Sequence, residues 1–298
     1  MDSSDCQHAI SSNRKREIQG SIMVISKRAK FMATYQRQNF SMPDSVIFYV
    51  AKNPKTAELY LKMVKTCKYF FIKNPIIIFD SLDNYPGKWR VNEKPLDLTK
   101  YNCQYWITDK INASAYVFVD KNIFSPIIPK LYRCDAKSLF LYFQVVSFIE
   151  LSLLISSAEK IDFHTVIVKK CDAVIPLEDI VAIAVNAKYV TVTKPTITSK
   201  TMKKLTELSH FLKLDNFELY DLCEVFDIDA FYFYMKKNPH TKFYLKFDPQ
   251  ISEGYMNRLE TIVDEILETE EFDYKPPWLD FIGLDIQKFA KLLWIYSH

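Results

Sequence analysis

The sequence predicts an α/β fold in which a short helical head is followed by a solenoid of strand–helix repeats with a parallel sheet. The main observation is a strand-like segment that recurs every 22 to 29 residues from about residue 135 onward, each time followed by apolar residues at helical spacing. The second is a pair of helix-like segments between residues 41 and 75. With 49% apolar and 25% charged residues, the 298-residue chain can bury a sizeable core.

Each repeat consists of a short strand, a turn and an amphipathic helix. The predicted strands span residues 138–143, 160–168, 188–193, 216–222 and 242–247. Repeats of about 20–29 residues are typical of leucine-rich and related solenoids. One strand and one helix cannot bury their apolar faces alone, whereas stacked units share a continuous core and leave one sheet face for a partner. An ordinary α/β domain is the alternative, which we rank second because the chain has no nucleotide-binding fingerprint.

Helix start signals lie between the predicted strands. Ser147 and Glu150 form a capping-box pattern, in which side chains at both positions satisfy free amides of the first turn. Pro176 opens the next helix, with two acidic residues in its first turn. Ser199, Asp227 and Ser252 each precede a run of apolar residues at helical spacing, which predicts that they mark the starts of later helices.

The segment 41–75 predicts two helices. Pro43 suits an early position of the first helix. Asn53 is a plausible cap for the second, with Pro54 in its first helical position. Apolar residues then recur at steps of three and four, which predicts a wide apolar face on a helix of about 20 residues. Asn74-Pro75 ends this helix, because the residue before a proline avoids the helical conformation.

The remaining segments complete the predicted organisation. Strands are expected near residues 76–79, 104–107 and 115–119, a turn at Tyr85-Pro86-Gly87, and a loop between Pro126 and Pro129. We expect five regions: 1–40 a disordered extension, 41–75 the helical head, 76–135 a connecting strand and loop region, 136–272 the repeats, and 273–298 a C-terminal tail or cap.

Composition argues against most enzyme and metal sites. Only four glycines occur, so phosphate-cradling loops and nucleophile elbows are not expected. The six cysteines are scattered, which indicates free thiols rather than a zinc site or a disulfide framework. His164 and Cys171 have no third group beside them in the pattern. We therefore expect no catalytic residues, no metal site and no cofactor, and classify the chain as a non-enzyme.

The expected location is intracellular. The first 40 residues are polar and lack the apolar core of a secretory signal, and no stretch of 18 uncharged apolar residues exists that would predict a membrane span. We expect a cytoplasmic protein with no membrane partner. The cluster Arg14-Lys15-Arg16 leaves a nuclear location as the alternative.

Several segments resemble a known family. Met42-Pro43-Asp44, followed 24 residues after Pro43 by the cysteine of Cys67-Lys68-Tyr69-Phe70, is similar to the opening and closing parts of an F-box. Met42 stands where that motif has leucine. Over about residues 41–277 the chain resembles a roundworm-expanded family that joins an F-box-like head to leucine-rich-repeat-like units. Its other matching phrases are Cys67-Lys68-Tyr69-Phe70-Phe71-Ile72-Lys73-Asn74-Pro75, Ile197-Thr198-Ser199-Lys200-Thr201 and Glu265-Ile266-Leu267-Glu268-Thr269.

The resemblance implies a function that composition does not. F-box proteins are substrate-recognition adaptors of cullin–RING ubiquitin ligases: the head binds the linker subunit of the ligase, and the repeats hold a target protein. The resemblance implies that the linker-binding face is formed by Pro43, Val46, Leu61, Val64, Cys67 and Phe70. The expected partners are therefore the linker subunit and a target.

Two alternatives remain open. The chain is expected in either case to be a protein-interaction scaffold, but the helical head could be a structural cap with no ligase role. A nucleic-acid binder is the less favoured class. Strand aromatics could stack on bases, yet the net charge of +3 gives no strongly basic face and favours packing of these rings in the core or rim. They are Tyr142, Phe143, Phe163, Tyr189, Tyr220 and Tyr244.

Overall fold

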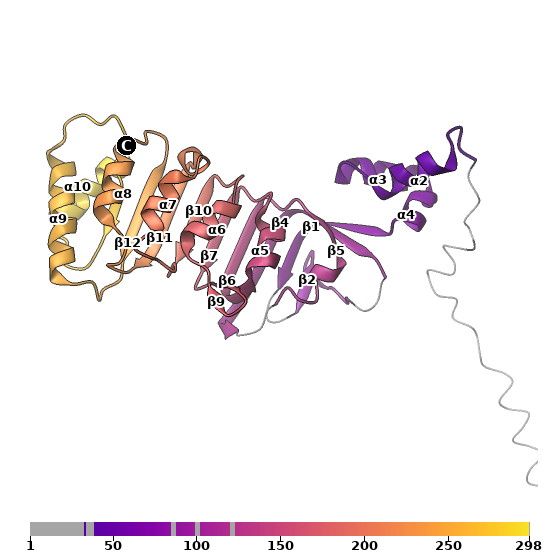
Figure 1. Ribbon diagram of the computed structural model, residues 1–298, viewed down its shortest axis with the longest axis horizontal. Coiled ribbons are helices and arrows are strands. Elements are labelled where there is room, and N and C mark those ends of the chain that lie inside the picture. The colour runs from indigo at the N-terminus through magenta and orange to yellow at the C-terminus, as the bar shows by residue number, and fades with distance from the viewer. Residues whose placement is uncertain (1–32, 34–38, 85–87, 99–101, 120–122, 298) are drawn as a thin grey trace, which may run out of the picture. The chain divides into compact units, whose positions relative to one another are not determined.

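A computed structural model describes residues 33, 39–84, 88–98, 102–119 and 123–297, with side chains described except at 116–119 (Figure 1). The chain divides into two compact units, Met1–Asn74 and Pro75–His298, which are treated separately below. The turn predicted at Tyr85-Pro86-Gly87 lies outside the described residues, as does the predicted disorder of residues 1–40 apart from residues 33, 39 and 40.

The head contains three described helices in place of the two predicted between residues 41 and 75. They are α2 (Asp44–Lys52), α3 (Ala57–Thr66) and α4 (Lys68–Lys73). The prediction of one 20-residue helix is wrong because Cys67 has extended backbone angles, φ −149° and ψ 123°, that no helix continues through. The predicted cap is also wrong: Thr56 Oγ1 accepts from Leu59 N at 3.1 Å, whereas the Asn53 side chain donates back to Tyr49 O and closes α2.

A small polar core joins the three helices of the head. The hydroxyl of Tyr60 on α3 donates to Asn74 O at 2.6 Å, and the amide of Asn74 donates to Ala51 O on α2 at 3.1 Å. Tyr60 and Asn74 are almost fully buried, so each hydrogen bond satisfies a group that would otherwise be costly to remove from water. These bonds close the end of α4 against α2 and α3.

The second unit is a mixed α/β structure with a large, mostly parallel sheet, which confirms the predicted class. Its strands are β1 (Ile76–Asn84), β2 (Trp89–Val91), β3 (Lys94–Pro95), β4 (Gln104–Val119), β5 (Leu131–Cys134), β6 (Ser138–Ser147), β7 (Lys160–His164), β8 (Ile167–Lys170), β9 (Ala173–Val174), β10 (Tyr189–Thr193), β11 (Asn216–Leu222), β12 (Lys242–Phe247) and β13 (Trp278–Asp280). The spatial order is β13-β12-β11-β10-β7-β6-β4-β1-β2-β3. From β1 to β13 this path is parallel and follows the chain, so each strand lies beside the strand of the next unit (Figure 1).

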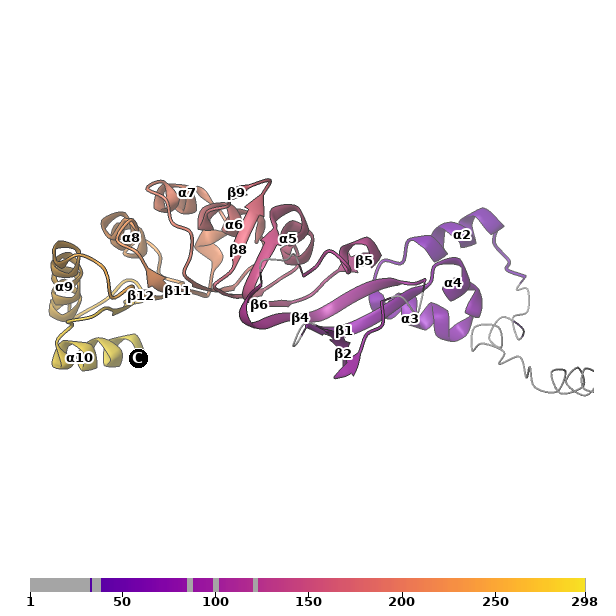
Figure 2. The same cartoon turned by 90° about the horizontal axis from the view of Figure 1, so that it is seen from below.

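Helices cover one face of this sheet. They are α5 (Phe148–Ile155), α6 (Leu177–Ile183), α7 (Thr201–Glu207), α8 (Ile228–Met235) and α9 (Glu253–Glu268), with two short 3-10 turns at Ile128–Lys130 and Phe211–Lys213. Figure 2 shows α5 to α9 on the same side of the strands, and α10 (Ile286–Ser297) on the opposite side at the β12 end. The last region, predicted as a tail or a cap, therefore adds β13 to the sheet and places a helix on its other face.

The core consists of apolar side chains aligned across strands. Leu141, Phe163, Val192, Leu219 and Leu245 occupy one register row of β6, β7, β10, β11 and β12 and face the helices. None is more than 7% exposed. Burying such a side chain contributes roughly 1.5–3 kcal/mol, so the row holds neighbouring units together. Because side chains alternate along a strand, the residues between the buried ones point to the open face.

The repeat strands were largely predicted from the sequence. The strands 216–222 and 242–247 have the bounds expected, and the predicted caps Asp227 and Ser252 accept from Ala230 N and Tyr255 N. Other details differ. Residues 160–168 fall in two strands, β7 and β8, residues 104–119 form one strand rather than two, and β1 and β6 extend beyond the predicted ranges. Ser147 makes no side-chain capping bond, and Lys200 rather than Ser199 precedes α7.

A left-handed residue recurs at one place in four successive units. The backbone angle φ lies between 53° and 56° at Phe143, Thr165, Lys194 and Asp221. Thr165 directly follows β7 and Lys194 directly follows β10, and Phe143 and Asp221 occupy the matching positions in β6 and β11. At this position Lys194 N donates to Tyr220 O on the next strand at 2.9 Å. The cross-strand hydrogen bond offsets a backbone conformation that side chains with a Cβ adopt at a cost.

The free-energy cost of positive φ should be largest at Thr165, because a β-branched residue is least tolerant of this backbone conformation. We expect Thr165→Gly to raise the free energy of unfolding by about 0.5–1 kcal/mol, measured by urea denaturation. Thr193→Gly, in the adjoining extended strand β10, is the matched control and should lower it by a similar amount. Destabilisation by both substitutions would show that position 165 is not strained.

Candidate interaction surfaces

The open face of the sheet carries a row of polar and aromatic side chains. Asp162 on β7, Thr191 on β10, Glu218 on β11, Tyr244 on β12 and Trp278 on β13 occupy successive positions of one register row. All but Trp278 are half-buried, and Trp278 is 7% exposed. The regular alternation of the strands thus places acids and aromatics side by side, although they lie far apart in the sequence.

Neutral donors hold the two carboxylates of this row. The Tyr142 hydroxyl donates to Asp162 Oδ2 at 2.8 Å. Glu218 accepts from the Asn216 amide at 2.5 Å and from the Tyr220 hydroxyl at 3.2 Å. Within the described part of the chain, no Lys, Arg or His forms a salt bridge with either carboxylate. The acids are therefore positioned but not neutralised.

Aromatic rings continue the surface toward the C-terminal end of the sheet. The rings of Tyr220 and Tyr244 lie 4.9 Å apart, and those of Tyr244 and Trp278 are stacked at 6.0 Å with a 9° interplanar angle. On α10, Phe289 and Tyr296 contact Trp278 edge-on at 5.1 and 5.7 Å. These contacts fix α10 on the open face, so the accessible part of that face lies between α10 and the β1–β3 end.

Burial changes the acidity of the tyrosines on this face. Removal from water raises the pKa of Tyr142 to about 12, with a further contribution from its hydrogen bond to Asp162. Burial raises the pKa of Tyr244 to about 12 as well, assisted by the negative charges of Asp280 and Glu218. Both hydroxyls therefore stay protonated at neutral pH and act as hydrogen-bond donors.

The helical head exposes an unusual amount of apolar surface. Seven large apolar side chains of α2, α3 and the preceding residues are between 37% and 68% exposed. They are Met42, Val46, Phe48, Tyr49, Val50, Leu59 and Leu61, which we call the head apolar surface. Single exposed apolar residues are ordinary, but such a concentration on a small unit makes this a candidate interaction surface.

The residues predicted to bind a linker subunit lie on all three helices of the head. Val46 and Leu61 are each 42% exposed and belong to the head apolar surface. Pro43 is exposed at the start of α2, and Val64, Cys67 and Phe70 are partly buried. Phe70 contacts the rings of Phe40 and Tyr69 at 6.1 and 5.8 Å. Whether these six residues bind a linker subunit stays a prediction.

The histidine and cysteine weighed as a catalytic pair lie in different surroundings. His164, at the end of β7, packs edge-on against Phe143 at 5.0 Å. Cys171 is exposed in the turn between β8 and β9. In the part of the chain that the structure covers, no three His, Cys, Asp or Glu side chains come close enough to hold a metal ion. The helices described there are also too short or too polar to cross a bilayer.

The sequence predicts aromatic residues on the strands but not the face that each occupies, and it does not predict the acids of the open face. Tyr142, Tyr220 and Tyr244 lie on that face, whereas Phe163 is buried in the core. The available signal was strand alternation: Asp162 lies between buried Ile161 and Phe163, which predicts that it points to the open face. The pairing of the acids with hydroxyls of other residues has no local sequence signal.

Comparison with models of protein families, with curated proteins and with solved structures finds no match for this chain. Its function is therefore argued from the surfaces themselves.

Alkaline pH should weaken the fold through the open-face tyrosines. Tyrosine titrates near pH 10 in the unfolded chain, so the raised pKa of Tyr142 contributes stability below pH 10 that is lost as pH rises toward 12. Between pH 10 and 12 we expect the free energy of unfolding, measured in urea titrations, to fall by roughly 1 kcal/mol less in Tyr142→Phe than in the unmodified chain, allowing for solvent screening. Equal slopes for Tyr142→Phe and the unmodified chain would contradict this assignment.

Proposed function

We propose that this chain is a protein-interaction scaffold that serves as a substrate-recognition adaptor of a cullin–RING ubiquitin ligase. The head apolar surface is the observation that carries the proposal. The fold proposed to underlie it is an F-box-like head followed by a leucine-rich-repeat-like solenoid.

Most of the large apolar side chains of α2 and α3 lie outside the interior of the head, which supports binding to another protein. In α2 only Ile47 and Ala51 are buried, and in α3 only Tyr60. Val46 and Leu61, two of the residues that the F-box resemblance assigns to the linker, are among those left exposed. A partner that covered this surface would gain roughly 25 cal/mol for each Å² of apolar area removed from water.

The second unit supports a target-binding role for the open face. Strand order that follows chain order, with helices α5 to α9 on one face, is what a strand–helix solenoid requires. The face left open presents Tyr220 and Tyr244, and tyrosine is enriched at protein interfaces because it offers an apolar ring and a polar tip. Asp162 and Glu218 add fixed hydrogen-bond acceptors that would select the partner.

A second candidate function is a repeat-based binding protein without a ligase role. The open face favours this second function, because every residue of the aromatic and acidic row belongs to the second unit. In that case the head would be a structural cap. A nucleic-acid role is disfavoured, because Asp162 and Glu218 lie without a paired cation on the face that a phosphate backbone would have to approach.

The linker subunit of a cullin–RING ligase is the partner that tests the adaptor proposal. We expect the full chain to bind the purified subunit in calorimetry, and Leu61→Asp to weaken the affinity at least about tenfold, because it places a charge in the apolar contact. Val225→Asp is the matched control: Val225 is 51% exposed in a turn of the second unit, so the same substitution there should leave the affinity unchanged.

Both substitutions are at exposed positions, so circular dichroism should show the fold of the unmodified chain in each. Absence of binding by the unmodified chain would reject the adaptor role and leave the repeat-based binding protein. Unchanged affinity in Leu61→Asp would place the contact outside the head apolar surface.

A further inference from the structure

A polar pocket of about 470 Å³ opens at the β1–β2 end of the second unit. Its lining comes from β1, β2, the turn after β2, β4 and β6. The lining residues are Asp83, Arg90, Glu93, Asn112, Ser114 and Tyr142. A volume of this size lies in the range of small-molecule sites, and each lining side chain can form hydrogen bonds or carry a charge.

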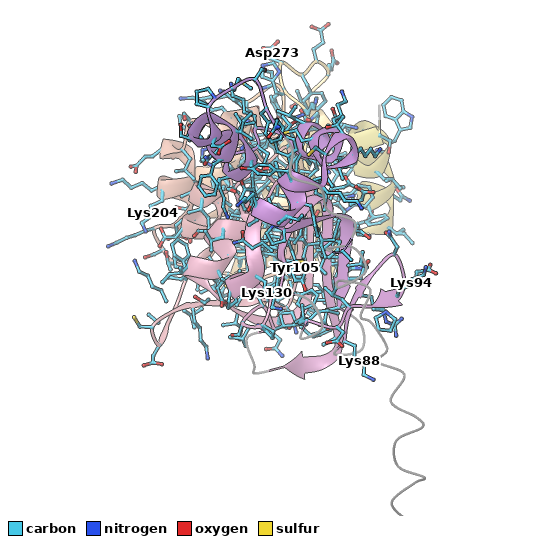
Figure 3. All side chains as sticks on the ribbon, turned by 90° about the vertical axis from the view of Figure 1, so that its right-hand side faces the viewer. Lys88, Lys94, Tyr105, Lys130, Lys204 and Asp273 are labelled. Atoms are coloured by element: carbon cyan, nitrogen blue, oxygen red, sulfur yellow. The ribbon has the colours of Figure 1, made fainter. Side chains whose placement is uncertain are left out.

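A tight hairpin builds one wall of the pocket. Strands β2 and β3 are joined by Asn92 and Glu93, with φ of 48° and 65°, and positive φ at both positions defines a two-residue type I′ turn. Figure 3 places Lys94 of β3 and Lys204 of α7 on opposite sides of the molecule, so the hairpin lies on the side of the sheet away from the helix layer. The hairpin thus contributes both Arg90 and Glu93 to the pocket lining.

The charged groups of the pocket do not satisfy one another. Arg90 and Asp83 are register partners on adjacent strands, yet the Arg90 side chain forms no ion pair with a described residue, and its buried Nε atom has no acceptor. The Oδ1 atom of Asn112 is also buried without a donor. Among the described residues, half-buried Asp83 accepts from the Ser81 hydroxyl at 3.3 Å, and exposed Glu93 forms no salt bridge. Buried polar atoms usually have partners, so Arg90 Nε and Asn112 Oδ1 point to a ligand that supplies them, and Asp83 and Glu93 have acceptor capacity to add.

We propose that this pocket binds a zwitterionic ligand that carries both a carboxylate and a cationic amine or guanidinium. Arg90 holds the ligand's carboxylate, which suits its planar fork of donors. Asp83 and Glu93 hold the cationic groups. Two acids against one guanidinium leave the lining with a net charge of −1, which favours a ligand with a second positive charge. A basic α-amino acid and the C-terminal arginine or lysine of a protein share this chemistry.

All six lining residues belong to the second unit, so this inference goes beyond the adaptor role and is tested separately from it. Tyr142 links it to the rest of the open face: its hydroxyl is occupied by Asp162, which fixes the orientation of the ring at the pocket wall.

L-Arginine is the probe for the test, with the full chain in calorimetry or ligand-detected NMR. A ligand of about a dozen heavy atoms in an open polar site should bind in the low-millimolar range. We expect Arg90→Gln to weaken binding by about tenfold or more, the usual effect of losing a charged hydrogen-bond partner. Arg258→Gln removes an equal charge on α9, where Arg258 pairs with Asp229, and should have no effect.

Glu93→Gly separates binding from folding. Glycine is the residue best suited to positive φ, so this substitution should preserve or raise the thermal midpoint while weakening arginine binding. Agmatine, which lacks the carboxylate, should bind at least about tenfold more weakly than arginine. Equal affinity of Nα-acetyl-arginine and arginine would assign the site to a protein C-terminus, and strong preference for arginine would assign it to the free amino acid.

Three results would each overturn the proposal. The first is a lack of saturable binding by any of these probes at about 20 mM, which is well above the expected range. The second is unchanged affinity for arginine in Arg90→Gln. The third is agmatine binding as tightly as arginine.

Discussion

The in-register stacking of apolar side chains across the parallel strands is the constraint on which the second unit depends. Leu141, Phe163, Val192, Leu219 and Leu245 each contact the row members of neighbouring units, so no unit has a core of its own. A slip of one residue in any strand would turn its apolar set toward the open face and its polar set toward the helices. The core therefore fixes the register, and the register fixes every side chain on the open face.

The open face gains its chemistry from this register without any local motif. Glu218 receives bonds from Asn216 and Tyr220 of its own strand, and Tyr220 in turn packs on Tyr244 of the next strand. Because the buried row holds the backbone, these side chains are preorganised for the binding that we propose. A preorganised surface loses less conformational entropy on binding, which favours specific recognition by a modest number of polar groups.

Sequence patterns predict the features that depend on local periodicity and miss those that depend on distant partners. The bounds of β11 and β12 and the caps Asp227 and Ser252 follow from alternation and capping chemistry within a few residues. The break at Cys67 has no glycine or proline to announce it, and the left-handed Thr165 is a residue type that ordinarily avoids positive φ. The pocket is harder still, because the parallel pairing of β1 with β4 brings its lining together across a long connection.

The two units present surfaces with different physical behaviour. Contact with the head apolar surface would be driven by removal of side chains such as Phe48 and Leu59 from water, which depends on area and little on salt. The open face instead offers Asp162 and Glu218 in fixed hydrogen bonds, where affinity depends on matching each acceptor with a donor. An apolar surface suits a constant partner and a polar, preorganised one suits discrimination among partners. This difference in physical behaviour supports the proposal that a common subunit binds the head and a selected target binds the sheet.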